Sequence, residues 1–171
     1  MDKLTQKSQE ALQAAQELAR ERSQQELDGP HLALALVRKV DTIVPTLLQR
    51  AWVDLSALEH DLNAELDRRA KVDGVNSSDV FLSRDLKQAF DRAADEAKKL
   101  SDEFLSAEHL LLGLLESSSS LKKIWAKHGV KREVLLEKIG EVRGSQRVTD
   151  ANPEDKFEAL EKYGKDLTAL A

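Results

Sequence analysis

Cysteine is absent from the 171-residue sequence, which also has only three prolines and an aromatic share of 4%. Without cysteine the chain can form no disulfide, no thiolate zinc site and no cysteine nucleophile. The scarcity of proline and aromatic residues favours helices over sheets. A chain of this length can bury about two-thirds of its unfolded surface, so we expect one stable domain.

Long hydrophobic runs are also missing. The longest, LALALV and LLLGLL, are far too short to cross a bilayer, and the N-terminal MDKLTQKSQE lacks the apolar centre of a signal peptide. A net charge of −5 disfavours a nucleic-acid or anionic-membrane partner. We therefore expect a cytoplasmic protein that binds neither nucleic acid nor membrane.

Motifs for catalysis and for cofactors are missing as well. The sequence contains no G-x-x-x-x-G-K-S/T phosphate-binding loop, no H-E-x-x-H and no G-x-S-x-G. Its four histidines have no second metal ligand at a useful helical spacing. We expect no enzymatic activity, no metal and no cofactor in this chain.

The sequence does contain an internal repeat, because residues 4–37 align without a gap on residues 82–115. The clearest stretch sets LDGPHLALALV over LSAEHLLLGLL. The identical pairs are Leu4 and Leu82, Ala11 and Ala89, Ala15 and Ala93, Ala19 and Ala97, Ser23 and Ser101, Leu27 and Leu105, His31 and His109, Leu32 and Leu110, Leu34 and Leu112, and Leu36 and Leu114. Such matches indicate one helical unit used twice. The repeated histidine predicts packing or a buried hydrogen bond rather than catalysis.

Helical periodicity covers almost everything before residue 143. After a first helix capped by Thr5, the predicted helices are His31–Val40, Val44–Arg50, Ser56–Arg69, Asp85–Leu100, Ala107–Glu116, Leu121–Lys127 and Arg132–Val142. No strand is predicted. The expected fold is an all-α, pseudo-twofold bundle of about eight helices.

The domain limits follow from this pattern. Residues 1–143 form the predicted domain, with the first repeat at about 4–70 and the second at about 82–143. Residues 144–153, GSQRVTDANP, have the composition of a flexible linker. Residues 154–171 resume an amphipathic helix, which we interpret as the start of another domain.

The double repeat, with H-L-x-L-x-L at the opening of its second helix, resembles the Clp N-terminal repeat of AAA+ chaperones. The tail VRGSQRVTDANPEDKFEALEKYGKDLTALA is similar to the segment that follows this domain in the ClpB disaggregases. The resemblance covers essentially the whole chain. It implies an all-helical N-terminal domain that engages unfolded or aggregated proteins.

The same resemblance implies the context of the longer protein. ClpB disaggregases are cytosolic, homohexameric ATPases that bind ATP and Mg²⁺ and work with the DnaK chaperone system. In that family the nucleotide-binding loops lie outside this domain. The resemblance therefore implies a chain without ATPase activity, and we expect it to be monomeric in isolation.

Three positions tied to N-domain function in the family can be placed on this sequence. The threonine of the opening L-T pair matches Thr5, the acid before the F-x-S-x-E run matches Asp102, and the glutamate of S-x-E-H matches Glu108. Each also has a structural interpretation as a helix cap, a turn residue or a first-turn acid. The first repeat carries Gln24 and Pro30 at the slots of the two acids, and this asymmetry favours a special role.

Substrate capture should fall on apolar surface. The family resemblance places a groove near the first helix of the second repeat, and its candidate lining residues are Leu86, Phe90, Leu105 and Leu110. Membership of the core is the alternative interpretation of all four. Arg92, Glu96 and His109 are expected around the groove and would make it polar.

One position departs from the repeat. Trp52 stands where the second repeat has Gly129, after a helix where glycine is favoured. We expect a reshaped turn or local strain there, with the indole in the core or covering the turn rather than binding a partner. For the chain as a whole, the alternative to substrate engagement is an adaptor-docking module of a protease-coupled Clp ATPase.

Overall fold

The computed structural model describes residues 3–72, 80–144 and 146–153. Within these ranges the elements are α1 (Gln6–Glu21), β1 (Glu26–Leu27), α2 (Gly29–Arg38), α3 (Val44–Arg50), α4 (Leu55–Asp67), β2 (Phe81–Leu82), α5 (Arg84–Lys99), α6 (Ala107–Leu114), α7 (Ser119–Lys127) and α8 (Arg132–Arg143). The predicted all-α fold is confirmed, and the helix bounds lie within about two residues of those expected. The helix predicted within residues 154–171 lies outside the described residues.

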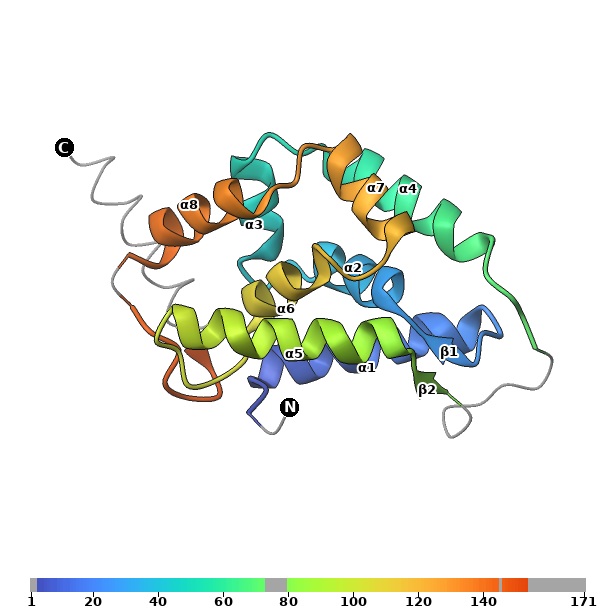
Figure 1. Ribbon diagram of the computed structural model, residues 1–171, viewed down its shortest axis with the longest axis horizontal. Coiled ribbons are helices and arrows are strands. Elements are labelled where there is room, and N and C mark those ends of the chain that lie inside the picture. Colours follow the sequence, from blue (N-terminus) through green and yellow to red (C-terminus); the bar gives the residue numbers. More distant parts are fainter. Residues whose placement is uncertain (1–2, 73–79, 145, 154–171) are drawn as a thin grey trace.

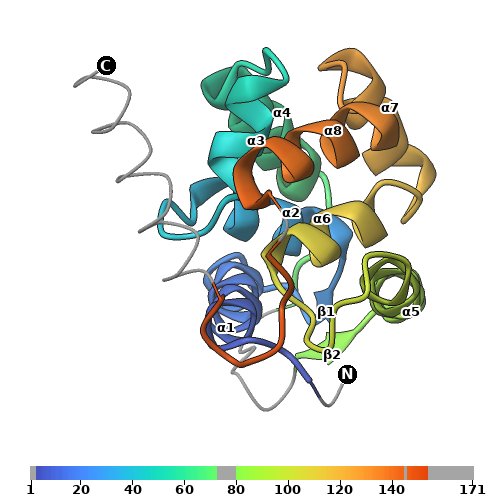
Figure 2. The same cartoon turned by 90° about the vertical axis from the view of Figure 1, so that its left-hand side faces the viewer.

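The helices form three layers (Figures 1 and 2). Helices α1 and α5 form one outer layer, α2 and α6 lie in the middle, and α3, α4, α7 and α8 form the opposite outer layer. The core runs through all three layers. Helix α1 packs on α2 through Ala11, Ala15 and Ala19, which are fully inaccessible.

The two repeats are joined by short parallel backbone pairings that sequence periodicity did not predict. Strand β1 pairs with β2 through Leu27 and Leu82, and Leu4 forms an isolated bridge with Leu105. These two pairings are equivalent under the repeat, because the residue before each first helix pairs with the residue before the other repeat's second helix. Segments of two residues are too short to carry an alternating pattern.

The described part of the predicted linker packs on the domain. We call residues 146–153 the strap. After α8 it runs back to the start of α1 (Figure 2), where the backbone N–H of Gln6 donates to the carbonyl of Ala151 at 2.7 Å. Val148 is fully buried. The packed structure therefore continues past the predicted boundary at residue 143.

Candidate functional site

The three residues that the family resemblance singled out lie at one end of the molecule and are all buried. Thr5 precedes α1, Asp102 lies in the turn after α5, and Glu108 lies in the first turn of α6. In this conformation they form part of the interior rather than an open surface. A role for them in substrate binding stays a prediction.

Thr5 has two structural tasks. Its side-chain oxygen accepts from the backbone N–H of Ser8 at 3.2 Å, which caps α1 as predicted. Its own N–H donates to the carbonyl of Leu105 at 3.0 Å, while Leu105 donates back to the carbonyl of Lys3 at 2.7 Å. Thr5 thereby ties the start of the first repeat to the second.

Asp102 accepts hydrogen bonds from three sides. One carboxylate oxygen accepts from His109 Nε2 at 2.7 Å, and the other accepts from Arg143 Nη2 at 2.6 Å and from the backbone N–H of Val148 at 2.8 Å. Burial alone would raise the pKa of Asp102, but the hydrogen bonds from His109, Arg143 and Val148 lower it to about 2. The carboxylate is therefore charged over the physiological range.

Glu108 completes this buried cluster. Its carboxylate accepts from Arg143 Nη1 at 3.3 Å and from the hydroxyl of Ser106. The Arg143 side chain is only 3% exposed and lies between the two acids. One arginine facing two carboxylates explains in structural terms why acidic residues stand at both positions. No signal in the sequence marked Arg143 as their partner.

The corresponding position of the first repeat lacks this buried charged cluster. His31 occupies the slot of His109, and its Nε2 donates to the amide oxygen of Gln24 at 2.7 Å. Both ring Nδ1 atoms accept a backbone N–H, from Asp28 at 3.0 Å and from Ser106 at 2.9 Å, which closes a capping box at the start of α2 and of α6. The buried hydrogen bond predicted for the repeated histidine is confirmed.

The four apolar candidates lie in the core. Leu86, Phe90 and Leu110 are at most 2% exposed and Leu105 is 6% exposed. In the described structure they support helices α5 and α6 from within and offer almost no surface to a ligand. Their predicted contact with substrate would need a different conformation, and it stays a prediction.

Grooves do lie beside the first helix of each repeat, and they occupy equivalent places. In the second repeat a groove of about 170 Å³ is lined by Arg92, Asp95, Glu96, Lys99, Leu112, Leu115, Glu116 and Arg132. In the first repeat a groove of about 380 Å³ is lined by Ala14, Glu17, Leu18, Glu21, Ala35, Arg38, Lys39, Val40 and Asp41. We call these the second-repeat groove and the first-repeat groove.

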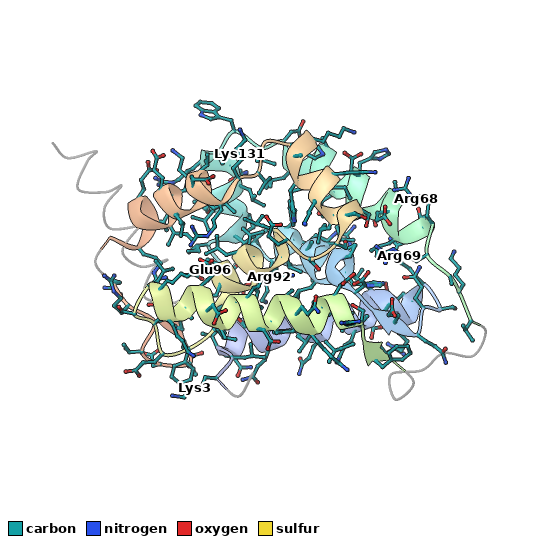
Figure 3. The ribbon with its side chains drawn as sticks, viewed as in Figure 1. Lys3, Arg68, Arg69, Arg92, Glu96 and Lys131 are labelled. Atoms are coloured by element: carbon teal, nitrogen blue, oxygen red, sulfur yellow. The ribbon has the colours of Figure 1, made fainter. Side chains whose placement is uncertain are left out.

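The second-repeat groove has the polar character that the sequence predicted. Arg92 and Glu96 lie on α5 next to α6 (Figure 3), where Arg92 Nε donates to the carbonyl of Gly113 at 3.2 Å. Glu96 accepts two hydrogen bonds from Arg132, at 3.0 and 2.9 Å. His109 was expected here too, but it is fully buried in the cluster with Asp102.

The first-repeat groove is larger and more apolar for a reason visible in the sequence. Ala14 stands at the slot of Arg92 and Leu18 at the slot of Glu96, so this groove has no counterpart of Arg92 or of the ion pair that Glu96 forms. Val40 at its edge is 87% exposed. The exchange of Arg92 for Ala14 and of Glu96 for Leu18 between the two repeats is the sequence signal that marks this groove.

The expectation that the Trp52 indole lies in the core or covers the turn is wrong. The side chain is 94% exposed, and the backbone has a left-handed φ of 64°, close to the 69° of Gly129. The N–H groups of Trp52 and Val53 donate to the carbonyls of Gln49 and Leu48. The turn is thus not reshaped, and the tryptophan accepts the backbone strain that glycine avoids.

Among the described residues, no group of three or more histidine, aspartate or glutamate side chains is placed to hold a metal ion. No helix in the same ranges has the length and apolar character needed to cross a membrane.

The sequence was also compared with known proteins. Residues 3–128 match the family model of the Clp repeat (R) N-terminal domain. The chain belongs to this family. The chaperone protein ClpB of Nitratidesulfovibrio vulgaris is 43% identical over 173 aligned residues, which cover 99% of this chain and 20% of that protein. The chain therefore spans about a fifth of the length of this relative.

Solved structures agree on the fold. The N-terminal domain of Hsp104 from Candida albicans superposes with a TM-score of 0.77 at 23% identity, covering 89% of this chain and 99% of that one. A complex of the ClpV N-domain with a VipB peptide gives a TM-score of 0.64 at 20% identity, covering 81% of this chain and 86% of that one. The predicted identity as a ClpB-type N-terminal domain made of two Clp repeats is confirmed.

Proposed function

We propose that this chain is the substrate-engaging domain of an ATP-dependent disaggregase and that the first-repeat groove binds unfolded or aggregated polypeptide. The observation that carries the proposal is the apolar character of this groove, in which Ala14 and Leu18 stand in place of the charged Arg92 and Glu96 of the second repeat. Unfolded chains differ from folded ones in exposing apolar side chains, so an open apolar groove is suited to them.

Several charged residues at the rim of the groove already form ion pairs. Lys39 contacts Glu10 at 2.9 Å and Asp41 at 3.2 Å, and Arg38 contacts Glu59 at 3.1 Å. Because these rim charges already have partners, they add little net attraction for a charged peptide. We infer that affinity comes mainly from apolar burial and is weak, as repeated capture and release of substrate requires.

The test is a substitution that gives the first repeat the residue of the second. Leu18→Glu should weaken binding of a fluorescently labelled, reduced and carboxymethylated protein by about tenfold, because it places a carboxylate in the apolar groove. Phe81→Glu also replaces an apolar side chain with a carboxylate, at a residue 56% exposed outside both grooves, and it should leave the affinity unchanged. Equal affinities for wild type and Leu18→Glu, measured by fluorescence anisotropy, would contradict the proposal.

An adaptor-docking module is the second candidate. It is favoured by the solved complex in which a ClpV N-domain of the same fold holds a VipB peptide. Tight binding of one defined peptide by this chain, with no binding of denatured protein, would select this alternative.

The remaining properties are proposed for the longer protein. We propose that ATP and Mg²⁺ bind outside this chain, that the full protein assembles as a homohexamer in the cytoplasm, and that it acts with the DnaK chaperone system. This chain alone should then be monomeric and hydrolyse no ATP. Both properties can be measured directly, by sedimentation and by phosphate release.

A further inference from the structure

The strap is held in the way a domain holds an extended peptide. The backbone N–H groups of Glu103 and Phe104 both donate to the carbonyl of Val148, at 2.7 and 3.3 Å. The N–H of Val148 donates to Asp102, and the carbonyl of Ala151 accepts from Gln6. These contacts use the strap's main chain, which every polypeptide carries, so they do not depend on its sequence.

Val148 is the strap residue whose side chain enters the core beside Asp102. Val148 is fully buried and belongs to the core cluster, whereas its neighbours Arg147 and Thr149 are exposed. This alternation is that of an extended strand lying on a surface. The domain thus has a slot for one apolar residue, which we call the strap slot and define by Asp102, Glu103 and Phe104 together with the space filled by Val148.

The polar wall of the strap slot is organised by residues of the folded repeat. Asp102 is fixed by His109 and Arg143, and Arg143 is fixed in turn by Glu108. The acceptor for an incoming N–H is therefore in place before any segment arrives, which lowers the cost of binding. In the first repeat, Gln24 uses its oxygen on His31 and its nitrogen on the carbonyl of Leu66.

We propose that the strap slot is a second binding site for extended polypeptide, selective for a β-branched apolar residue with a free N–H, and that residues 146–151 occupy it as an intramolecular ligand. A segment tethered by a few residues has an effective concentration of about millimolar. An incoming chain therefore binds only by displacing the strap. This site is separate from the first-repeat groove and goes beyond the function proposed above.

The strap slot also gives the three family positions a common task. Asp102 supplies the acceptor, Glu108 holds the arginine that fixes Asp102, and Thr5 lies beside Gln6, whose N–H contacts the strap. Asp102 touches the bound segment directly, whereas Glu108 and Thr5 are positioning residues.

The test uses the full chain and a fluorescent synthetic peptide with the sequence of residues 146–152, QRVTDAN. Val148→Thr keeps the shape of the side chain but buries a hydroxyl, so it weakens the strap without altering the slot. We expect the peptide to bind this variant about tenfold tighter than wild type. Thr149→Ser, at the exposed neighbour, should behave as wild type, and a peptide with aspartate in place of valine should not bind.

Hydrogen exchange of the Glu103 amide reports the state of the strap independently. It should speed up in Val148→Thr and slow again when the peptide is added. Val148→Asp should release the strap more completely than Val148→Thr does. If the strap is released in either variant and the peptide still does not bind more tightly, the proposal is wrong. If neither variant releases the strap, it is not a displaceable ligand and the proposal is wrong as well. Leu18→Glu should not change binding of the peptide in this assay, so the two proposed sites can be refuted independently of each other.

Discussion

Acidification should destabilise the domain through His31, a ring that the fold holds in one neutral tautomer. The side chain is 1% exposed. Its Nδ1 accepts from the N–H of Asp28, and its Nε2 donates to Gln24, whose own amide nitrogen donates to the carbonyl of Leu66 at 2.7 Å. A proton on Nδ1 would face the N–H of Asp28 and break the capping box at the start of α2.

The size of the effect follows from the pKa. Burial lowers the pKa of His31 to about 4, with Asp28 opposing and Arg69 assisting this shift. The unfolded ring has its ordinary pKa of about 6.5, so between these values the unfolded state binds more protons. Stability therefore falls as the pH is lowered through this range. At about pH 4.5 the loss attributable to His31 is about 2.5 kcal/mol relative to pH 7.

Urea unfolding followed by circular dichroism, at pH 7 and at about pH 4.5, measures this loss. His31→Gln removes the titration, and its amide oxygen can still accept the Asp28 N–H, as glutamine does at this position of a capping box. We expect the wild type to lose about 2.5 kcal/mol more than the variant. His60→Gln, at an exposed histidine, should show the wild-type loss. Equal losses in wild type and His31→Gln would refute the reasoning.

Three further substitutions should change the free energy of unfolding, each measured by urea titration at pH 7. Trp52→Gly should stabilise by about 0.5–1 kcal/mol, because it relieves a left-handed backbone and removes a side chain that buries nothing. Gly113→Ala should destabilise by about 3 kcal/mol, because the new Cβ would lie 2.3 Å from the carbonyl oxygen of Ala89. Gly140→Ala, with no atom within 4 Å, is its control and should stabilise slightly. Arg143→Gln should cost about 3 kcal/mol or more by leaving two buried carboxylates without their cation. Little change in Arg143→Gln would contradict the buried cluster.

Helix positions could be predicted because several signals agreed on them. Helical periodicity, the cap at Thr5 and the repeat itself all indicated helices in the same places. The parallel pairing of Leu27 with Leu82 could not be predicted, because it joins two short segments far apart in the sequence. It depends on how the repeats dock, which local periodicity does not contain.

The candidate site was harder to predict, because its partners come from distant elements. The charges of Asp102 and Glu108 are explained by Arg143, which lies 41 and 35 positions further along the chain. Arginine at the end of a helix is usually solvated, so nothing in the local sequence marked Arg143 as buried. The packing of Val148 was missed for a similar reason, since a single apolar residue in a polar segment has the composition of a linker.

The two repeats differ at the positions where we propose that polypeptide binds. At the first helix of each, Leu18 faces a groove in the first repeat, whereas Glu96 at the same slot is paired with Arg132. At the opening of the second helix, Gln24 closes the position in the first repeat, while Asp102 receives a segment in the second. In our proposal the repeats are therefore complementary, because each keeps a binding feature that the other has replaced with an internal contact. A variant that carries both Leu18→Glu and Val148→Thr should bind extended peptide less tightly in the first-repeat groove and more tightly in the strap slot. Weaker binding of the peptide at both sites would contradict this proposal.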